Sequence, residues 1–206
     1  MKKFLIGWIV LLLAGPLAVT ARAQSVDLPA LVAQLRQGGH VIVMRHGATH
    51  RDQADTDPFN LDNVARQRQL NDSGRDVARL VGEAWRKLGI PLGSVYTSRF
   101  NRAVETGRLI SGAEVIASVD VTEGGQVVTP IENDRRAEAM RKLAGTPPAA
   151  GKNTLIVTHK PNILDAFGRD WFDIREGESV VFKPDASGKA QPLGRVAAAD
   201  WIKGAK

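Results

Sequence analysis

Two runs of apolar, mostly β-branched residues constrain the fold of this chain more than any other feature. The first is VIVM at positions 41–44, preceded by His40, and the second is TLIVT at 154–158. Each has the length of a strand and lacks the polar alternation of a half-exposed one. Such continuous runs are typical of buried strands in parallel sheets, whose faces are covered by helices. The two runs therefore predict an α/β fold.

The segments around these runs support that prediction. Residues 25–37 place apolar side chains at helical spacing, and a second amphipathic helix follows Asn71-Asp72-Ser73, a sequence typical of a helix start. The remaining elements are predicted as helices at 98–110, 133–143 and 161–167, and strands at 95–97, 114–117, 179–183 and 193–197. Strands that alternate with helices favour three layers, with a mainly parallel central sheet and helices on both faces.

The first 23 residues have the layout of a secretory signal peptide. A basic start precedes a nearly unbroken apolar run from Phe4 to Leu13, and Ala21-Arg22-Ala23 is typical of a cleavage site. The alternative is an uncleaved anchor, for which the apolar run is short. We therefore expect residues 24–206 to form a single periplasmic or secreted domain, with no stable membrane anchor after cleavage.

Composition excludes several classes of protein. The chain has 28 basic and 22 acidic residues, and loss of Lys2, Lys3 and Arg22 with the signal peptide leaves 25 basic residues and a net charge of +3. This mild charge argues against a nucleic-acid partner. The chain has no cysteine, which excludes disulfides, zinc–thiolate sites, iron–sulfur clusters and cysteine nucleophiles.

Polar side chains follow three of the predicted strands where each strand ends. Arg45-His46-Gly47 follows the first buried run, Ser98-Arg99 follows the strand at 95–97, and His159 follows the second buried run. In open parallel sheets, ligands bind beyond the carboxyl ends of the strands. A guanidinium matches phosphate oxygens, and a neutral imidazole can attack phosphorus. These side chains therefore predict a phosphate site that uses no metal and no cofactor.

Three segments resemble the signature of the histidine phosphatase superfamily, whose fold is phosphoglycerate-mutase-like. Arg45-His46-Gly47 is similar to its RHG motif, residues 98–106 resemble its S-x-x-x-R-A-x-[QE]-T segment, and residues 155–159 resemble its strand that ends in a second histidine. The order and spacing agree over nearly all of residues 40–168. With its N-terminal segment, the chain resembles a small exported branch of this superfamily.

The resemblance implies a role for each matching residue. His46 would be the nucleophile that forms a phosphohistidine, and Arg45, Arg102 and His159 would bind the phosphoryl group. The acid-phosphatase branch has an aspartate directly after the second histidine, whereas this chain has Lys160. The resemblance to the acid-phosphatase branch therefore supplies no general acid at this position.

Two glutamates are candidates for this general acid, as in the mutase-like branch. Glu123 lies in a glycine-containing loop after a predicted strand, and Glu132 has the position of a helix-start residue. We prefer Glu123, because an acidic residue at a helix start interacts favourably with the helix dipole and has a structural reason to be there. Some small members of the superfamily use no obvious acid, which leaves a third alternative open.

These observations predict an exported, metal-independent phosphomonoesterase that acts through a phosphohistidine on a small phosphorylated metabolite or an envelope phosphate group. The interval between Arg102 and His159 has no room for a large capping domain, so we expect an open pocket formed by loops 48–66 and 118–131. The alternatives are a non-catalytic periplasmic phosphate-binding protein and a phosphoglycerate-type mutase. Residues 66–69, RQRQ, are interpreted as a solvated loop, and the sequence predicts no oligomeric state.

Overall fold

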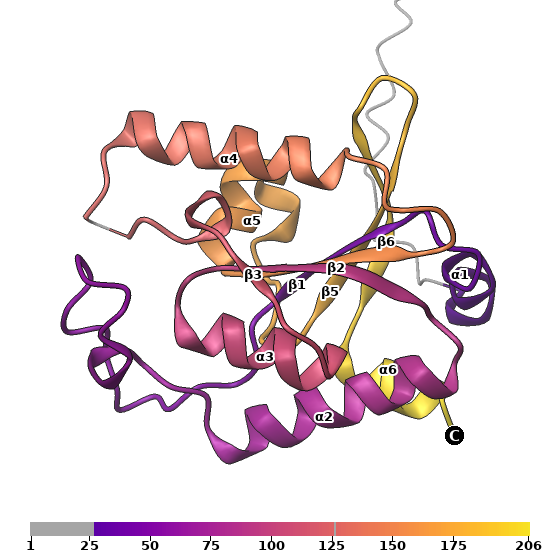
Figure 1. Ribbon diagram of the computed structural model, residues 1–206, viewed down its shortest axis with the longest axis horizontal. Coiled ribbons are helices and arrows are strands. Elements are labelled where there is room, and N and C mark those ends of the chain that lie inside the picture. The colour runs from indigo at the N-terminus through magenta and orange to yellow at the C-terminus, as the bar shows by residue number, and fades with distance from the viewer. Residues whose placement is uncertain (1–26, 126) are drawn as a thin grey trace, which may run out of the picture.

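A computed structural model describes residues 27–125 and 127–206 of the chain (Figure 1). The predicted signal peptide, residues 1–23, and its cleavage site lie outside these described residues. None of the helices in the two described ranges is both long enough and apolar enough to cross a membrane.

Within the described ranges, six strands form one central sheet in the order β3-β2-β4-β1-β5-β6. The strands are β1 (Val41–Arg45), β2 (Leu92–Thr97), β3 (Ile116–Ala117), β4 (Asn153–Thr158), β5 (Ser179–Pro184) and β6 (Ala190–Val196). Strand β4 pairs in parallel with β1 and β2, and β2 pairs in parallel with β3. Strand β5 is antiparallel to both β1 and β6. The predicted mainly parallel sheet is confirmed, with an antiparallel hairpin at one edge.

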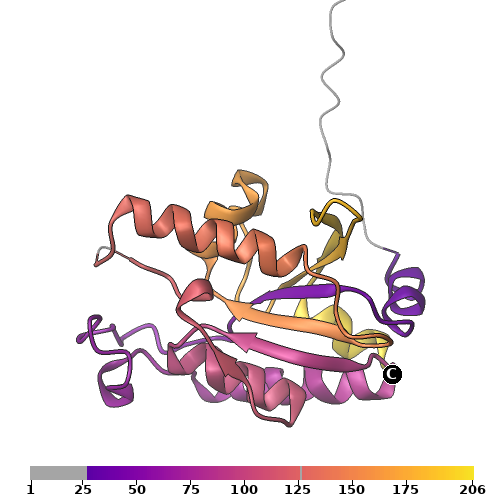
Figure 2. The same cartoon turned by 45° about the horizontal axis from the view of Figure 1, so that its top comes forward.

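Helices cover both faces of this sheet. They are α1 (Leu28–Leu35), α2 (Asp72–Lys87), α3 (Asn101–Ser111), α4 (Pro130–Ala144), α5 (Lys160–Phe167) and α6 (Ala198–Gly204). Figure 2 shows α4 and α5 on one side of the sheet and α2, α3 and α6 on the other. The predicted three-layer α/β architecture is confirmed.

The central position of β1 explains its unbroken apolar sequence. Ile42 and Met44 face the hydrophobic cluster under α2, α3 and α6, whereas Val41 and Val43 face a second cluster under α4 and α5. All four side chains are buried. Because successive side chains of a strand point to opposite faces, a strand with helices on both sides needs apolar residues at every position.

The helix starts follow from local capping. Asn71 accepts a hydrogen bond from the backbone N–H of Gly74 at 2.8 Å, as expected for the residue before α2. Helix α4 begins at Pro130, three residues earlier than predicted. Thr129 accepts a hydrogen bond from the Glu132 N–H at 3.2 Å, and proline is well suited to the first helical position. The sequence Thr-Pro-Ile-Glu therefore contains a capping signal that the prediction passed over.

Helix α6 was not predicted. Trp201 of this helix is fully buried, packs edge-on against Trp85 with ring centroids 5.5 Å apart, and donates a hydrogen bond from Nε1 to Ser179 Oγ at 2.9 Å. Its apolar neighbours Ala198 and Ile202 lie at helical spacing and pack against the same core. The helix is short, and its stability comes from this packing more than from its sequence.

Candidate active site

The three predicted strand ends meet at one edge of the sheet. Strand β4 lies between β1 and β2, and all three run in the same direction. His46 follows β1, His159 follows β4, and Arg102 lies in the first turn of α3, just after β2. The His46 N–H donates to the carbonyl oxygen of Thr158 at 3.0 Å, which extends the β1–β4 ladder to the site. The predicted convergence of these residues is confirmed.

The imidazole of His46 is held in one orientation. Its Nδ1 atom lies 2.8 Å from the carbonyl oxygen of Gly47. A carbonyl oxygen only accepts hydrogen bonds, so Nδ1 carries the proton and Nε2 keeps its lone pair. Burial, reinforced by the charges of Arg102 and Arg45, lowers the pKa of His46 to about 3. His46 is therefore a neutral imidazole at neutral pH.

The turn after β1 is fixed by contacts with two helices. The Gly47 N–H donates to Thr106 Oγ1 of α3 at 3.1 Å. On the α2 side, a Cβ atom at position 47 would lie 3.1 Å from the carbonyl oxygen of Gly74, closer than most real side chains come. Glycine at position 47 therefore lets the turn approach the start of α2 closely.

His159 lies beside His46, with ring centroids 5.1 Å apart. Its Nε2 atom is 2.7 Å from Ser98 Oγ, and its Nδ1 atom is 3.3 Å from Glu123 Oε1. Burial and the nearby charge of Arg102 hold the pKa of His159 well below its usual range. Ser98, which the sequence analysis gave no role, therefore orients the second histidine.

Arg102 is completely buried and paired with two carboxylates. Its Nη1 atom donates to Asp55 Oδ1 at 2.9 Å, and its Nη2 atom donates to Glu123 Oε1. Its guanidinium carbon lies 4.2 Å from the centre of the Phe100 ring, a cation–π contact. Asp55 comes from loop 48–66 and is a site residue that the sequence analysis did not find.

Arg45 is the last residue of β1, and its guanidinium is held by two residues of the segment before β5. Its Nη1 atom donates to the carbonyl oxygen of Ile174 at 2.9 Å, and its Nη2 atom lies 3.5 Å from Glu176 Oε1. The same carboxylate oxygen accepts a hydrogen bond from Thr49 Oγ1 at 3.1 Å. These contacts fix the guanidinium while leaving its Nε atom without a partner in the described residues.

The two arginines predicted to bind phosphate each carry a buried Nε atom that has no hydrogen-bond partner among the described residues. An arginine N–H only donates, buried donors are nearly always paired in native proteins, and phosphate oxygens are acceptors that match them. The Nδ1 atom of His159 makes no hydrogen bond with the described residues either, although it lies 3.3 Å from Glu123 Oε1. Within the same described ranges, no group of three or more His, Asp or Glu side chains is placed to hold a metal ion.

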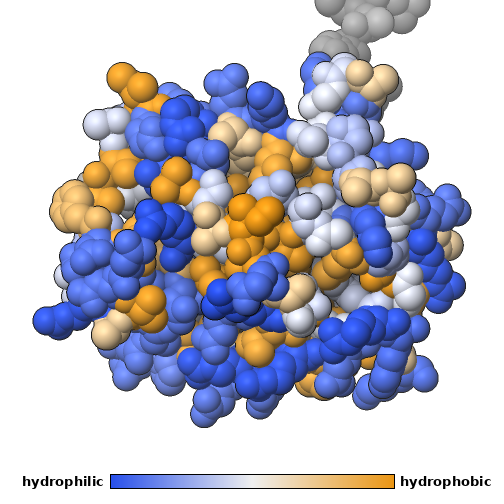
Figure 3. Space-filling view, in the orientation of Figure 1, coloured by the Kyte–Doolittle hydropathy of each residue, from blue (hydrophilic) through white to orange (hydrophobic). Residues whose placement is uncertain are grey.

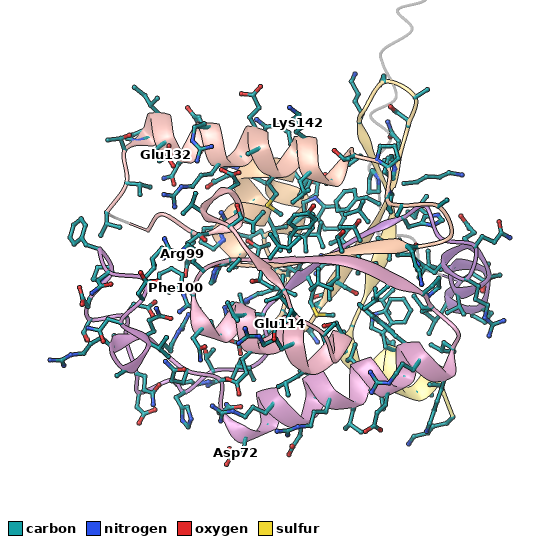
Figure 4. All side chains as sticks on the ribbon, viewed as in Figure 1. Asp72, Arg99, Phe100, Glu114, Glu132 and Lys142 are labelled. Atoms are coloured by element: carbon teal, nitrogen blue, oxygen red, sulfur yellow. The ribbon has the colours of Figure 1, made fainter. Side chains whose placement is uncertain are left out.

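The structure distinguishes the two glutamates. Glu123 contacts both Arg102 and His159. Glu132 lies at the start of α4 (Figure 4), where its carboxylate pairs with Arg135 and Arg136 at 2.8 Å each. The preference for Glu123 as the acidic residue of the site therefore agrees with the geometry, and Glu132 has the helix-start position that the sequence indicated.

The interpretation of residues 66–69 as a solvated loop was wrong for Gln67. Gln67 is buried, donates from Nε2 to the Leu61 carbonyl oxygen at 2.7 Å, and accepts from the Asn101 N–H at 2.7 Å. The positive charge of Arg68 contributes to the lowered pKa values of His46 and His159. This segment therefore supports the start of α3 and adds a third arginine near the two histidines.

A cavity of about 290 Å³ opens beside Arg102, lined by Asp55, Pro58, Phe100, Glu123, Gly124, Gly125 and Val127. Figure 4 shows Phe100 and Arg99 at the end of the sheet that faces this region. The lining comes from loop 48–66, from the turn after β2 and from loop 118–131. The two loops expected to form the pocket therefore line this cavity together with Phe100.

Comparisons with known proteins agree with this geometry. The family model described as "Histidine phosphatase superfamily (branch 1)" matches residues 41–125, a range that contains both His46 and Arg102. The protein histidine phosphatase SixA, solved with tungstate, superposes with a TM-score of 0.55 at 17% identity, covering 78% of this chain and 97% of its own. A search of curated protein sequences gives no match.

Two other solved structures are similar to this chain. YhfR of Bacillus stearothermophilus has a TM-score of 0.53 at 18% identity, covering 74% of this chain and 94% of its own. A mutant phosphoserine phosphatase of Entamoeba histolytica, in complex with phosphoserine, has a TM-score of 0.52 at 16% identity, covering 77% and 97%. At these identities the likeness shows a shared fold.

The family match, the shared fold and the paired histidines together define a phosphatase with a phosphoglycerate-mutase-like architecture. Over residues 41–125, the chain matches the histidine phosphatase superfamily.

Proposed function

We propose that this protein is a metal-independent phosphomonoesterase that forms a phosphohistidine at Nε2 of His46. The observation that carries the proposal is the 2.8 Å contact between His46 Nδ1 and the Gly47 carbonyl oxygen. This contact fixes the tautomer in which Nε2 is unprotonated, the form that can attack phosphorus.

Binding would use the positive charge and the buried donors of the site. Arg45 and Arg102 supply guanidinium groups, each with a buried Nε atom that has no partner among the described residues, and His159 supplies its buried imidazole. A phosphate monoester carries nearly two negative charges, and phosphoryl transfer requires these oxygens to be held and neutralised. Arg68 adds further positive charge near both histidines.

The reaction would then proceed in two displacements. In the first, the Nε2 lone pair of His46 forms a bond to phosphorus while the ester P–O bond breaks, and the leaving oxygen takes a proton. In the second, water attacks the phosphohistidine, the N–P bond breaks, and inorganic phosphate leaves with His46 neutral again. A covalent intermediate divides one difficult hydrolysis into two easier steps.

Glu123 is the residue best placed to deliver the proton to the leaving oxygen. It contacts Arg102 and His159 and also lines the cavity beside them. Its carboxyl group therefore lies between the residues proposed to bind phosphate and the cavity.

The solved relatives support a phosphorylated substrate. SixA is a protein histidine phosphatase that was solved with tungstate, a tetrahedral oxyanion. The Entamoeba enzyme is a phosphoserine phosphatase that was solved with phosphoserine. For this chain we propose a small phosphorylated metabolite or an envelope phosphate group. The presence of His46 makes hydrolysis a better proposal than non-catalytic phosphate binding. The proposed export argues against a phosphoglycerate-type mutase, whose substrates are cytoplasmic.

The proposal is tested by hydrolysis of p-nitrophenyl phosphate in the presence of EDTA. We expect turnover by the wild-type protein and a loss of at least about 10³-fold in His46→Ala, because the nucleophile is removed. His50→Ala, a change of the same kind four residues away in the loop, should keep normal turnover. Activity that persists in His46→Ala would overturn the nucleophile, and wild-type activity abolished by EDTA would overturn metal independence.

Export of the protein is a separate part of the proposal. It is supported by the signal-peptide pattern of residues 1–23. The intact mass of protein isolated from a periplasmic fraction should correspond to residues 24–206. A full-length mass in the cytoplasmic fraction would contradict both export and cleavage.

A further inference from the structure

The cavity beside the phosphate site has an acidic wall and no basic one. Asp55 and Glu123 both line it, and each also contacts Arg102. Among the described residues that line the cavity, none is Lys or Arg. The neighbouring Arg99 does not line it and pairs with Asp62 at 2.6 Å. The cavity therefore lies against two carboxylates that also pair with the guanidinium proposed to bind phosphate.

The negative charge of this wall would be less fully neutralised when a substrate binds. In the structure, each terminal nitrogen of Arg102 is paired with one carboxylate, so a single positive charge faces two negative ones. A bound phosphate group competes for the same guanidinium. Asp55 and Glu123 then lose part of their only described cationic partner while a dianion lies next to them. A leaving group that is itself negatively charged would therefore be repelled by both carboxylates.

The remaining walls are suited to an uncharged carbon surface or to a cation. Pro58 and Val127 present apolar side chains from the two loops, and Phe100, whose ring packs against the Arg102 guanidinium, also lines the cavity. Gly124 and Gly125 complete the lining on the side of loop 118–131. Two carboxylates beside such an apolar lining favour positively charged groups.

We propose that this cavity receives the leaving group, and that Asp55 and Glu123 make the enzyme selective for phosphate monoesters of cationic alcohols, such as amino alcohols. Esters of neutral alcohols rank next, and esters whose alcohol carries a carboxylate or a second phosphate rank last. This inference rests on the proposed phosphatase function and names its substrate class. Asp55 is then a specificity-determining residue, since it faces both the guanidinium and the leaving group.

The first experiment compares kcat/KM for phosphocholine, glycerol phosphate and 3-phosphoglycerate, three monoesters of alkyl alcohols that differ mainly in charge. We expect the cationic ester to exceed the anionic one by at least about tenfold, because charges a few ångströms apart interact strongly at a partly buried site. The neutral ester should fall between them. Turnover of p-nitrophenyl phosphate is measured in parallel as the check on phosphatase function.

The second experiment tests whether Asp55 causes the selectivity. Asp55→Asn removes one charge from the cavity wall at nearly constant volume and should reduce the ratio between the cationic and anionic esters several-fold. Asp52→Asn removes the same charge from an exposed position of the same loop that does not line the cavity, and it should leave the ratio unchanged. If Asp55→Asn does not fold, the wild-type ranking still decides the inference.

The outcomes separate this inference from the function on which it rests. If p-nitrophenyl phosphate is hydrolysed and 3-phosphoglycerate is hydrolysed as well as phosphocholine or better, the selectivity is wrong and the phosphatase function stands. If Asp55→Asn and Asp52→Asn change the ratio equally, Asp55 does not determine specificity. If none of the four esters is hydrolysed, the proposed function fails and the inference fails with it.

Discussion

The Nη1 atom of Arg102 lies 2.9 Å from Oδ1 of Asp55, a residue 47 positions earlier in the chain. Asp55 is anchored in turn, because the same oxygen accepts a hydrogen bond from the Arg68 N–H at 2.9 Å. A carboxylate of loop 48–66 thus occupies one donor of the guanidinium that is proposed to bind phosphate. Phosphate binding must therefore displace this carboxylate or share the guanidinium with it.

Asp55→Asn should consequently bind inorganic phosphate more tightly than the wild type. The amide is a weaker partner for the guanidinium than the carboxylate, and it does not repel the arriving dianion. We expect the inhibition constant of phosphate against p-nitrophenyl phosphate to fall by about threefold to tenfold, which corresponds to roughly 1 kcal/mol. Asp52→Asn is the matched control and should leave the constant unchanged. Weaker inhibition in Asp55→Asn would mean that Asp55 positions Arg102 and does not compete with phosphate.

The two glutamates provide a matched pair for the general acid. Glu123→Gln should lower kcat by about 10² or more for glycerol phosphate, whose alkoxide needs a proton, and much less for p-nitrophenyl phosphate, whose leaving group is stable without one. Glu132→Gln should leave both rates unchanged, because this side chain pairs with Arg135 and Arg136 at the start of α4. An equal loss for both substrates in Glu123→Gln would assign Glu123 to positioning Arg102 and not to proton transfer.

Three buried histidines make the stability of the fold sensitive to acid. Burial is the largest cause of a lowered pKa in His40, His46 and His159. Above about pH 6.5 each imidazole is neutral in both the folded and the unfolded chain. Below it, the unfolded chain takes up protons that the folded chain does not, so the free energy of unfolding falls as the pH falls. For His46 this window extends from about 6.5 down to its folded pKa of about 3.

Urea unfolding between pH 7.5 and 5.5 measures this effect. Each buried histidine contributes a slope of up to about 1.4 kcal/mol per pH unit below the ordinary histidine pKa. His46→Asn removes one of the three groups and should flatten the dependence, whereas His50→Asn removes a histidine of the loop and should affect it less. Stability that is constant over this range would show that the buried imidazoles accept protons without unfolding.

Local patterns were sufficient to predict the strands and most of the site. The runs at 41–44 and 154–158 are apolar because both faces of β1 and β4 are buried. Once these strands are neighbours, His46 and His159 must meet at their ends. The position of Arg102 in the site could be predicted in the same way, because it lies in the first turn of the helix that follows β2.

Contacts made by irregular loops were not predictable in this way. Loop 48–66 contains Asp52, Asp55 and Asp57, and no periodicity distinguishes the one that reaches Arg102. The selection is made by tertiary contacts, such as the Arg68 N–H that holds Asp55 and the burial of Gln67. Helix α6 is different: its apolar spacing was visible, but its existence depends on the packing of Trp201 against α2.

The start of α2 determines the position of the turn that carries His46. A Cβ atom at Gly74 would lie 2.1 Å from the carbonyl oxygen of Ala48, two residues after His46. Gly74→Ala must therefore displace the backbone of this turn. Small misplacements of a catalytic group are costly, so we expect kcat/KM for p-nitrophenyl phosphate to fall by about tenfold to a hundredfold per folded molecule.

Gly82→Ala is the control for a loss of activity that results only from strain and lower stability of α2. It lies in the same helix, and its Cβ atom would come 2.3 Å from the carbonyl oxygen of Ile110 near the end of α3, in a clash of similar severity. Both variants should lose stability in urea unfolding, because backbone must shift in each. Only Gly74→Ala should lose activity per folded molecule, because Ala48 belongs to the catalytic turn and Ile110 does not. Equal kinetic losses in the two variants would mean that any strain on α2 reaches His46, and that the close approach of Gly74 to Ala48 has no special role.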